Sequence, residues 1–240
     1  PSPLPLHSIM SPTALVTGAT EGIGRATAVA LGRAGWRVGV CARTADRLDA
    51  LVGELAAEGI EAAASAGDVG RAEDAARMVR EIEARLGPVE TLVNNAGIAV
   101  FKELLDLSLE EWDRMMATNV RSLYLMTREV LPGMRERRGG NIVNVASLAG
   151  KNGVKGGTGY AASKHAVLGF SRSLMLEVRT LGIRVIAICP GSVDTALLDA
   201  LSPKRDRILQ PSDVADAIVA ALRLPARALV SELDVRPADP

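Results

Sequence analysis

The sequence predicts an α/β fold: a single domain with a parallel sheet of about seven strands and helices on both faces. Three observations predict it. Short β-branched and aliphatic runs alternate with amphipathic segments along the chain. The strand-like runs are almost continuously apolar, which is typical of strands buried on both faces. No Pro-, Gly- or Ser-rich linker and no change of composition divides this series, so we expect one domain.

The strands are expected where short apolar runs end in small or polar residues. In chain order they are TALVTGA (13–19), WRVGVCA (36–42), IEAAASA (60–66), ETLVNNA (90–96), GNIVNVA (140–146), IRVIAIC (183–189) and ALVSELDV (228–235). Between them, apolar residues recur at helical spacing. The predicted helices lie near residues 22–34, 45–58, 71–86, 108–117, 119–137, 158–181 and 211–223.

The first nine residues, PSPLPLHSI, are expected to stand apart from this domain. They contain three prolines and lack the basic start and continuous apolar core of a signal peptide. We interpret residues 1–9 as a disordered leader or cloning remnant and expect the folded domain at residues 10–240.

Composition excludes several classes of partner. The chain has 28 basic and 28 acidic residues and no long run of either sign, which favours neither nucleic acid nor a membrane surface. No apolar run reaches the roughly 18 residues that span a bilayer. Cys41 and Cys189 lie in apolar strand-like runs away from both histidines, which indicates buried thiols in a reducing, cytoplasmic compartment and no metal site. The expected partner is a small molecule or another protein.

A glycine-rich turn follows the first predicted strand. Gly18, Gly22 and Gly24 have the spacing G-x-x-x-G-x-G, and an apolar helical segment follows directly. Glycine permits the tight turn and removes the Cβ that would block a pyrophosphate, while the start of a helix presents free N–H groups to the anion. A strand before and a helix after are the context of a dinucleotide site, so the turn predicts a Rossmann fold.

The residue that reads the adenosine ribose follows such a turn by about 20 positions and is acidic in NAD-binding proteins. Here Arg43 occupies this place. An arginine can form bidentate contacts with a 2′-phosphate, so NADP(H) is favoured over NAD(H). Two observations leave the alternative open: arginines at strand ends are often simply solvated, and the carboxylate of Glu21 in the turn could lie near that phosphate.

The segment GYAASKHA (159–166) places Lys164 four positions after Tyr160. On a helix this spacing puts both side chains on one face, one turn apart. A phenol beside an ammonium is either a chance pair of surface side chains or a catalytic acid with a shifted pKa. The spacing alone does not distinguish these two interpretations.

Seven motifs in order resemble the classical short-chain dehydrogenases/reductases. They are residues 17–24, Gly67-Asp68-Val69, residues 94–97, Thr118-Asn119, Ser147, residues 160–164, and Pro190-Gly191 followed by Thr195. They span nearly the whole folded chain, whereas Y-x-x-x-K by itself is common. A match of all seven by chance is not credible.

The resemblance implies a role for each catalytic candidate. Tyr160 would protonate a carbonyl oxygen as hydride arrives, and Lys164 would lower the pKa of this phenol and hold the nicotinamide ribose. Lowering a tyrosine pKa by about three units requires roughly 4 kcal/mol of phenolate stabilisation. Ser147 would orient the substrate oxygen, and Asn119 would support a water relay to the lysine. Taken singly, Ser147 is also typical of a turn and Asn119 of a helix cap.

The resemblance also implies the cofactor contacts and the assembly. The cofactor residues would be Gly18, Thr20, Gly22, Ile23, Gly24, Arg43, Asp68, Val69, Asn95, Ala96, Gly97, Tyr160, Lys164, Pro190, Gly191, Val193 and Thr195. The helix at 158–181 carries small or apolar residues on more than one face, and family members often pair this helix across a two-fold axis. A homotetramer or homodimer is expected.

The end of the chain departs from the commonest branch of the family. The Gly-rich ending of the 3-oxoacyl-[acyl-carrier-protein] reductases is absent, and LQPSDVADAIVAALRLPARALVSELDVRP follows a short lid, TALLDALSPKRDRI. This ending is similar to the 3-hydroxy acid and serine dehydrogenases, so a small hydroxy acid/keto acid is the first expected substrate. Lys204, Arg205 and Arg207 of the lid would meet an acidic substrate or face water, and we favour water.

Three alternatives to that function remain. The first is a 3-oxoacyl-[acyl-carrier-protein] reductase-like ketoreductase. The second is a non-catalytic dinucleotide-binding regulator, which would be expected to have lost the Tyr, Lys or Ser, and none is lost. The third, an epimerase or dehydratase of the same fold, ranks last because that branch usually has a different Gly pattern and a longer C-terminal lobe.

Overall fold

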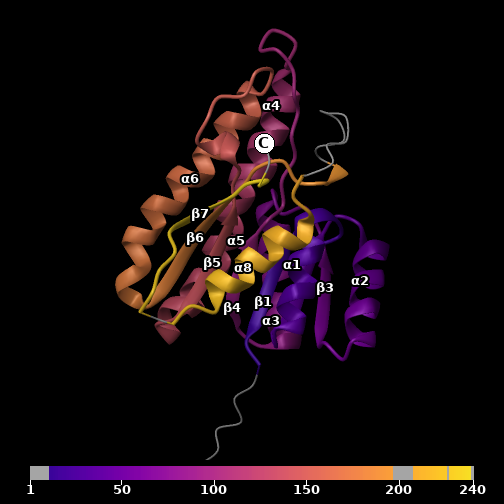
Figure 1. Ribbon diagram of the computed structural model, residues 1–240. Coiled ribbons are helices and arrows are strands. Elements are labelled where there is room, and N and C mark those ends of the chain that lie inside the picture. Colours follow the sequence, from indigo (N-terminus) through magenta and orange to yellow (C-terminus); the bar gives the residue numbers. More distant parts are fainter. Residues whose placement is uncertain (1–10, 197–207, 226, 239–240) are drawn as a thin grey trace, which may run out of the picture.

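The computed structural model describes residues 11–196, 208–225 and 227–238, and its centre is one sheet of seven parallel strands. The strands are β1 (Thr13–Thr17), β2 (Arg37–Ala42), β3 (Ala62–Ala66), β4 (Val89–Asn94), β5 (Gly140–Val145), β6 (Ile183–Pro190) and β7 (Glu232–Val235). Their order across the sheet is β3-β2-β1-β4-β5-β6-β7 (Figure 1). The predicted leader at 1–9 and most of the predicted lid lie outside the described residues.

Helices cover both faces of the sheet. They are α1 (Gly22–Arg33), α2 (Ala45–Ala57), α3 (Ala72–Leu86), α4 (Leu109–Met116), α5 (Ser122–Arg137), α6 (Thr158–Val178) and α8 (Pro211–Leu222). One buried apolar cluster joins α1, α2 and α8 to the sheet, and a second joins α3, α5 and α6 to the opposite face. The predicted fold class, a single-domain doubly wound α/β sheet with helices on both faces, is confirmed.

This topology determines where a ligand site can form. The strand order reverses between β1 and β4, because the chain builds β1 to β3 in one direction and then crosses back past β1. In open parallel sheets, ligands bind beyond the carboxyl ends of the strands at such a reversal. The ends of β1, β4, β5 and β6 therefore frame the candidate site.

Most predicted boundaries lie within two residues of those in the structure, and two larger differences have a physical cause. The separate helices expected at 108–117 and 119–137 are continuous, because a π-helical turn, Ala117–Arg121, joins α4 to α5. The last strand begins at Glu232 instead of residue 228. The reason is a turn: the N–H of Ala228 donates to the carbonyl of Pro225, and pairing with β6 starts only where Ala187 N donates to Ser231 O.

Two further findings concern the chemistry of the described chain. Cys41 and Cys189 are free and buried, and burial raises the pKa of their thiols to about 12 and about 11. None of the described helices is both long enough and apolar enough to cross a bilayer. Within the same residues, no three His, Cys, Asp or Glu side chains are grouped so that they could hold a metal ion.

Candidate active site

The glycine-rich turn between β1 and α1 is built by close backbone contacts. Gly18 and Gly22 have positive φ, at 63° and 54°, a region that side chains with a Cβ rarely adopt. A Cβ on Gly18 would lie 2.8 Å from the Cα of Ala96, and one on Gly24 would collide with the carbonyl oxygen of Gly18. The turn therefore requires glycine for its own geometry and for its contact with the end of β4.

The start of α1 has the features of an anion site. Its N-cap residue, Glu21, is extended and makes no side-chain capping hydrogen bond, so the first N–H groups of this twelve-residue helix receive no side-chain cap. Side chains are absent at Gly18 before the helix and at Gly22 and Gly24 in its first turn, so the backbone around these donors is open to close approach. A pyrophosphate fits both features, since it needs close approach to the backbone and N–H donors at a helix start.

Asn95 connects this turn to β4. Its side-chain Nδ2 donates to the carbonyl oxygens of Thr17 and Gly18, at 3.0 and 3.1 Å. In return, Thr17 Oγ1 accepts from the backbone N–H groups of Asn95 and Ala96, at 3.0 and 3.1 Å. The backbone N–H and the side-chain Nδ2 of Asn95 thus help to hold the two strand ends together. Thr17 lies within the predicted motif at 17–24 but was not among the predicted cofactor residues.

The segment after β6 closes the site on another side. A Cβ on Gly22 would lie 3.1 Å from Thr195 Cγ2, so this predicted residue faces the glycine-rich turn. Gly191 N donates to the carbonyl of Val235 in β7, and Val193 pairs with Leu209 in a single parallel bridge. Pro190, the last residue of β6, is buried. The structure therefore brings residues 190–195 to the same strand ends as the turn.

The outer end of the site carries the predicted adenosine contacts. Arg43 follows β2 directly and is exposed. Glu21 is paired with Arg47, in the first turn of α2, with 3.2 Å between Oε2 and Nη1. Asp68 Oδ1 accepts from Gly70 N at 2.9 Å, so its carboxylate shapes its own loop. Arg47 was not among the predicted site residues.

Tyr160 and Ser147 meet beyond the end of β5. Burial raises the pKa of the Tyr160 phenol, and hydrogen bonding with Ser147 acts in the opposite direction. Ser147 Oγ also accepts from Ala149 N at 3.1 Å, which caps the short 3-10 helix Leu148–Gly150. Ser147 therefore has the turn role that its sequence context indicates, and its side chain lies close enough to Tyr160 to influence the pKa of the phenol.

Lys164 is buried, with only 6% of its surface exposed, one helical turn from Tyr160. Its ammonium donates to the carbonyl oxygen of Val145 at 2.9 Å and lies 5.8 Å from the centre of the Tyr160 ring. Burial lowers the pKa of Lys164 to about 8. Lys164 was expected to lower the pKa of Tyr160, but the surrounding protein raises it. Burial is the dominant cause, and Lys164 is not among the causes.

Asn119 lies in the π-helical turn and binds two other parts of the site. Its Oδ1 accepts from Ile98 N and its Nδ2 donates to Ile98 O, both at 2.8 Å. The same Nδ2 donates to Ser163 Oγ at 2.9 Å, and Ser163 Oγ donates to Tyr160 O at 2.7 Å. A Cβ on Gly97 would lie 3.5 Å from Asn119 Oδ1 and 3.6 Å from Lys164 Nζ. The loop after β4, the π turn and α6 are therefore fixed to one another.

The structure thus brings most predicted site residues into one region at the strand ends. Val69 is buried and Thr20 and Ile23 are half-buried near the turn, without a polar side-chain contact that assigns them a function. Ser163 was not predicted, because its spacing within the Y-A-A-S-K segment gave no indication of its two hydrogen bonds. The lid residues Lys204, Arg205 and Arg207 lie outside the described residues.

Comparisons with known proteins agree with this geometry. The profile of the short chain dehydrogenase family matches residues 12–206. A putative ketoacyl reductase of Streptomyces coelicolor (strain ATCC BAA-471 / A3(2) / M145) is 43% identical over 189 residues, which cover 78% of this chain and 72% of that protein.

Two solved structures have the same fold over nearly their whole length. A variant of actinorhodin polyketide ketoreductase with NADPH is 37% identical, with a TM-score of 0.89 over 95% of this chain and 96% of that one. The closed form of serine dehydrogenase complexed with NADP+ is 32% identical, with a TM-score of 0.88 over 95% and 96% of the two chains. The chain belongs to the short chain dehydrogenase family, as its motifs predicted.

Proposed function

We propose that the protein is an NADP(H)-dependent ketoreductase that interconverts a carbonyl and a secondary alcohol. The observation that carries this proposal is the arrangement of Tyr160, Ser147 and Lys164 beside a glycine-rich turn that fits a pyrophosphate. A bound nicotinamide cofactor supplies the hydride. The catalytic residues are all present, which argues against a non-catalytic dinucleotide-binding regulator.

Each residue has a chemical role in this proposal. The Tyr160 hydroxyl donates its proton to the carbonyl oxygen, and Ser147 holds that oxygen by a hydrogen bond. Because burial raises the pKa of Tyr160, the phenol is protonated at neutral pH and is ready to act as an acid in the direction of reduction. The Lys164 ammonium would bind the nicotinamide ribose from its place beside Val145 O, and Asn119 keeps the surrounding backbone in register.

The preferred substrate is an acyl ketone of the 3-oxoacyl type. This preference rests on the higher identity to a putative ketoacyl reductase and on the likeness to a polyketide ketoreductase. A small hydroxy acid, the substrate that the C-terminal segment favoured, is the second candidate, supported by the likeness to serine dehydrogenase. The test is NADPH oxidation, followed at saturating cofactor with 3-oxoacyl thioesters and esters and, in parallel, with keto acids. Consumption with the keto acids alone would reverse the ranking.

Arg43 is expected to make NADP(H) bind more tightly than NAD(H). Its exposed guanidinium follows β2, and the pairing of Glu21 with Arg47 keeps the nearest carboxylate of the turn neutralised. One charge-assisted contact is worth roughly 1.5 to 3 kcal/mol, or about 10- to 100-fold in affinity. Arg43→Asp should therefore reverse the preference in fluorescence titrations with both cofactors.

The matched control for this variant is Arg33→Asp. Arg33 is also exposed, but it is the last residue of α1, away from the glycine-rich turn, and pairs with Glu58. This change should leave the ratio of the two affinities unchanged. Equal or tighter binding of NAD(H) by the parent protein would refute the role of Arg43.

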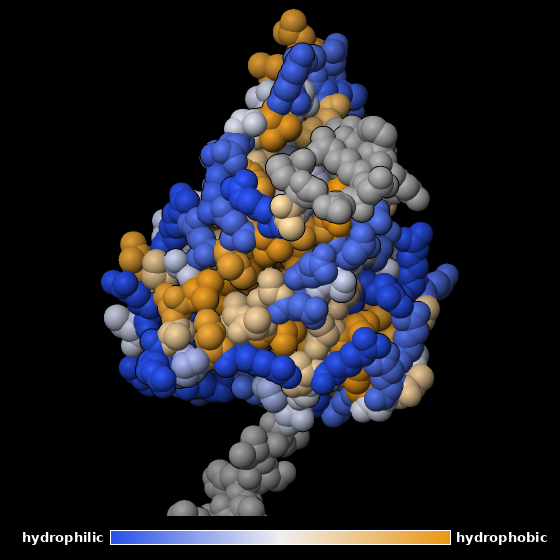
Figure 2. Space-filling view, in the orientation of Figure 1, coloured by the Kyte–Doolittle hydropathy of each residue, from blue (hydrophilic) through white to orange (hydrophobic). Residues whose placement is uncertain are grey.

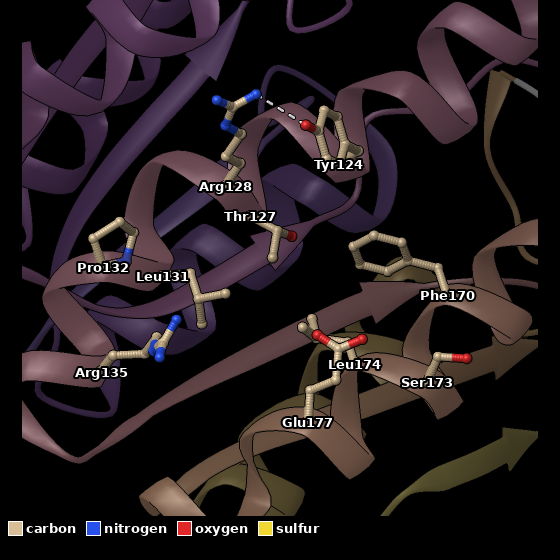
Figure 3. A pocket seen from close by; sticks show the side chains of 10 residues that line it. All are labelled: Tyr124, Thr127, Arg128, Leu131, Pro132, Arg135, Phe170, Ser173, Leu174 and Glu177. Carbon is tan, nitrogen blue, oxygen red and sulfur yellow. Dashed lines mark hydrogen bonds between the residues drawn. The ribbon is translucent and has the colours of Figure 1, made fainter.

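We also propose that the chain assembles through α5 and α6 as a homodimer or as part of a homotetramer. A groove between the two helices is lined by Tyr124, Thr127, Arg128, Leu131, Pro132, Arg135, Phe170, Ser173, Leu174 and Glu177 (Figure 3). It carries apolar side chains together with arginines on α5 and a glutamate on α6. A two-fold axis would place the arginines of one copy opposite the glutamate of the other, which is the self-complementarity that such an interface needs.

Light scattering at micromolar concentration tests the assembly. The parent should be a dimer or tetramer, and Leu176→Glu should shift it toward the monomer, because Leu176 is 60% exposed on α6 within one turn of Ser173. Leu105→Glu is the control: Leu105 is 99% exposed and lies between β4 and α4. A monomeric parent would contradict this proposal.

A further inference from the structure

Phe101 lies against the ring of Tyr160. The two ring centroids are 5.3 Å apart, and the planes are tilted by 51°. Phe101 belongs to the loop between β4 and α4 and is only half-buried, whereas 8% of Tyr160 is exposed. The catalytic phenol therefore has an aromatic neighbour with surface left uncovered, and this neighbour has no part in the chemistry described above.

Val154 extends this apolar surface from a second loop. It lies between the 3-10 helix Leu148–Gly150 and α6 and is 37% exposed. A Cβ on Gly157 would lie 2.9 Å from Val154 Cγ1 and 3.3 Å from Phe101 Cε1, so both side chains meet over this glycine. Gly157 is the N-cap residue of α6, and Tyr160 is in the first turn of that helix. Phe101 and Val154 together form what we call the apolar shelf.

The surroundings of the apolar shelf are also apolar. Tyr160, Met115 and Ala149 form a buried cluster against which Phe101 and Leu107 pack. Three exposed leucines follow, two in the same loop and one at the start of α4, and Figure 2 shows hydrophobic residues at this tip of the molecule. The exposed leucines are Leu104, Leu105 and Leu109.

Two of the three lysines of these two loops form ion pairs with carboxylates. Lys102 is paired with Glu111 at 2.6 Å. Lys151 is paired with Glu232 and Asp234 on β7, at 2.9 and 2.7 Å. Lys155, next to Val154, is exposed and is the cation to test separately. A substrate carboxylate placed on the apolar shelf would lose hydration without gaining either of the two paired ammonium groups, whereas an alkyl chain would gain by burial.

We infer that Phe101 and Val154 are specificity-determining residues that select carbonyl substrates with an alkyl or acyl chain next to the carbonyl, in preference to small acids with a carboxylate there. This inference rests on the proposed function. The carbon chain lies on the apolar shelf while the carbonyl oxygen meets Tyr160 and Ser147, so the shelf also orients the carbonyl.

A series of straight-chain methyl ketones of increasing length tests this inference. In the parent, kcat/KM should rise about fourfold per added methylene, the factor that corresponds to burying one CH₂ group. Phe101→Ala should abolish most of this rise, and Phe101→Leu should retain it. Leu105→Ala is the control for the same loop, and Lys155→Met is the control for charge. Both should keep the parent's dependence on chain length.

The outcomes separate the inference from the proposed function. NADPH binding by Phe101→Ala should match the parent and its thermal unfolding should remain cooperative, which shows that the variant is folded, although the lost ring contacts lower its midpoint. If the parent reduces ketones without a dependence on chain length, or if Phe101→Ala keeps that dependence, the apolar shelf is refuted and the ketoreductase proposal stands. If a keto acid is reduced faster than a methyl ketone of equal length, the inference is also wrong. If no ketone is reduced at all, both the inference and the ketoreductase proposal are refuted.

Discussion

Tyr160→Phe should lower turnover by about 10² to 10⁴-fold, the usual cost of losing a positioned acid. The change removes one oxygen from a buried side chain and leaves the ring contacts with Phe101 and Ala149 in place. NADPH affinity should stay within about twofold of the parent, since Tyr160 is only one of the seventeen proposed cofactor residues and the change keeps its ring. Steady-state kinetics and a fluorescence titration on the same preparation measure both effects.

A result that contradicts this assignment would be substantial activity of Tyr160→Phe on a substrate that the parent reduces well. The control is Tyr124→Phe, because Tyr124 is the second tyrosine of the chain and lies 47% exposed on α5. Its hydroxyl accepts from Arg128 at 2.9 Å and is not part of the catalytic group. Tyr124→Phe should retain turnover.

Lys164→Met should separate function from stability. Turnover and NADPH affinity should both fall, by at least 10-fold each, because the proposed duties of Lys164 include the ribose. The free energy of unfolding at pH 7 should instead rise by about 1 to 2 kcal/mol. Burial lowers the pKa of Lys164 from 10.5 to about 8, which costs the folded state roughly 3 kcal/mol when the group is ionised, and the lost hydrogen bond to Val145 O offsets about 1 kcal/mol.

The effect of Lys164→Met on the free energy of unfolding should depend on pH. Between pH 8 and 10.5 the unfolded chain keeps the proton on Lys164 while the folded chain has lost it, so this lysine contributes stability that rises with pH in that window. The difference between Lys164→Met and the parent should therefore be larger at pH 7 than at pH 9 in urea unfolding. Equal differences at both values, or a strongly destabilised variant at pH 7, would show that the ammonium is not buried at a cost.

The fold could be predicted from the sequence because local sequence patterns identify its helices and strands. Apolar runs such as TALVT and RVIAIC are long enough to identify buried strands, and the helices between them repeat at helical spacing. The start of β7 could not be predicted, because ALV in residues 228–230 has strand-like composition but follows a turn at Pro225. The continuity of α4 and α5 was not predicted, because an asparagine such as Asn119 is typical of a helix cap. In the structure its side chain does not cap a helix but binds the backbone of Ile98.

The positions of the site residues could be predicted, but their environments could not. The spacing of Tyr160 and Lys164 places them together on one helix, yet the raised pKa of the phenol depends on burial by residues distant in sequence, such as Phe101. Likewise, Asn95 was expected among the cofactor residues, while its amide in the structure holds the backbone of the glycine-rich turn. Such contacts between distant segments arise only after the sheet brings the strand ends together.

The most direct test of the central claim is transfer of deuteride from NADPH labelled at C4 of the nicotinamide. Samples with the A-face and the B-face label are each incubated with the parent and with a 3-oxoacyl ester, and the alcohol is analysed by mass spectrometry. We predict one deuterium on the carbinol carbon from one of the two samples, and almost none with Tyr160→Phe over the same time. Alcohol that carries no deuterium from either sample, or no alcohol from any carbonyl compound, would contradict the claim that this protein is an NADP(H)-dependent ketoreductase.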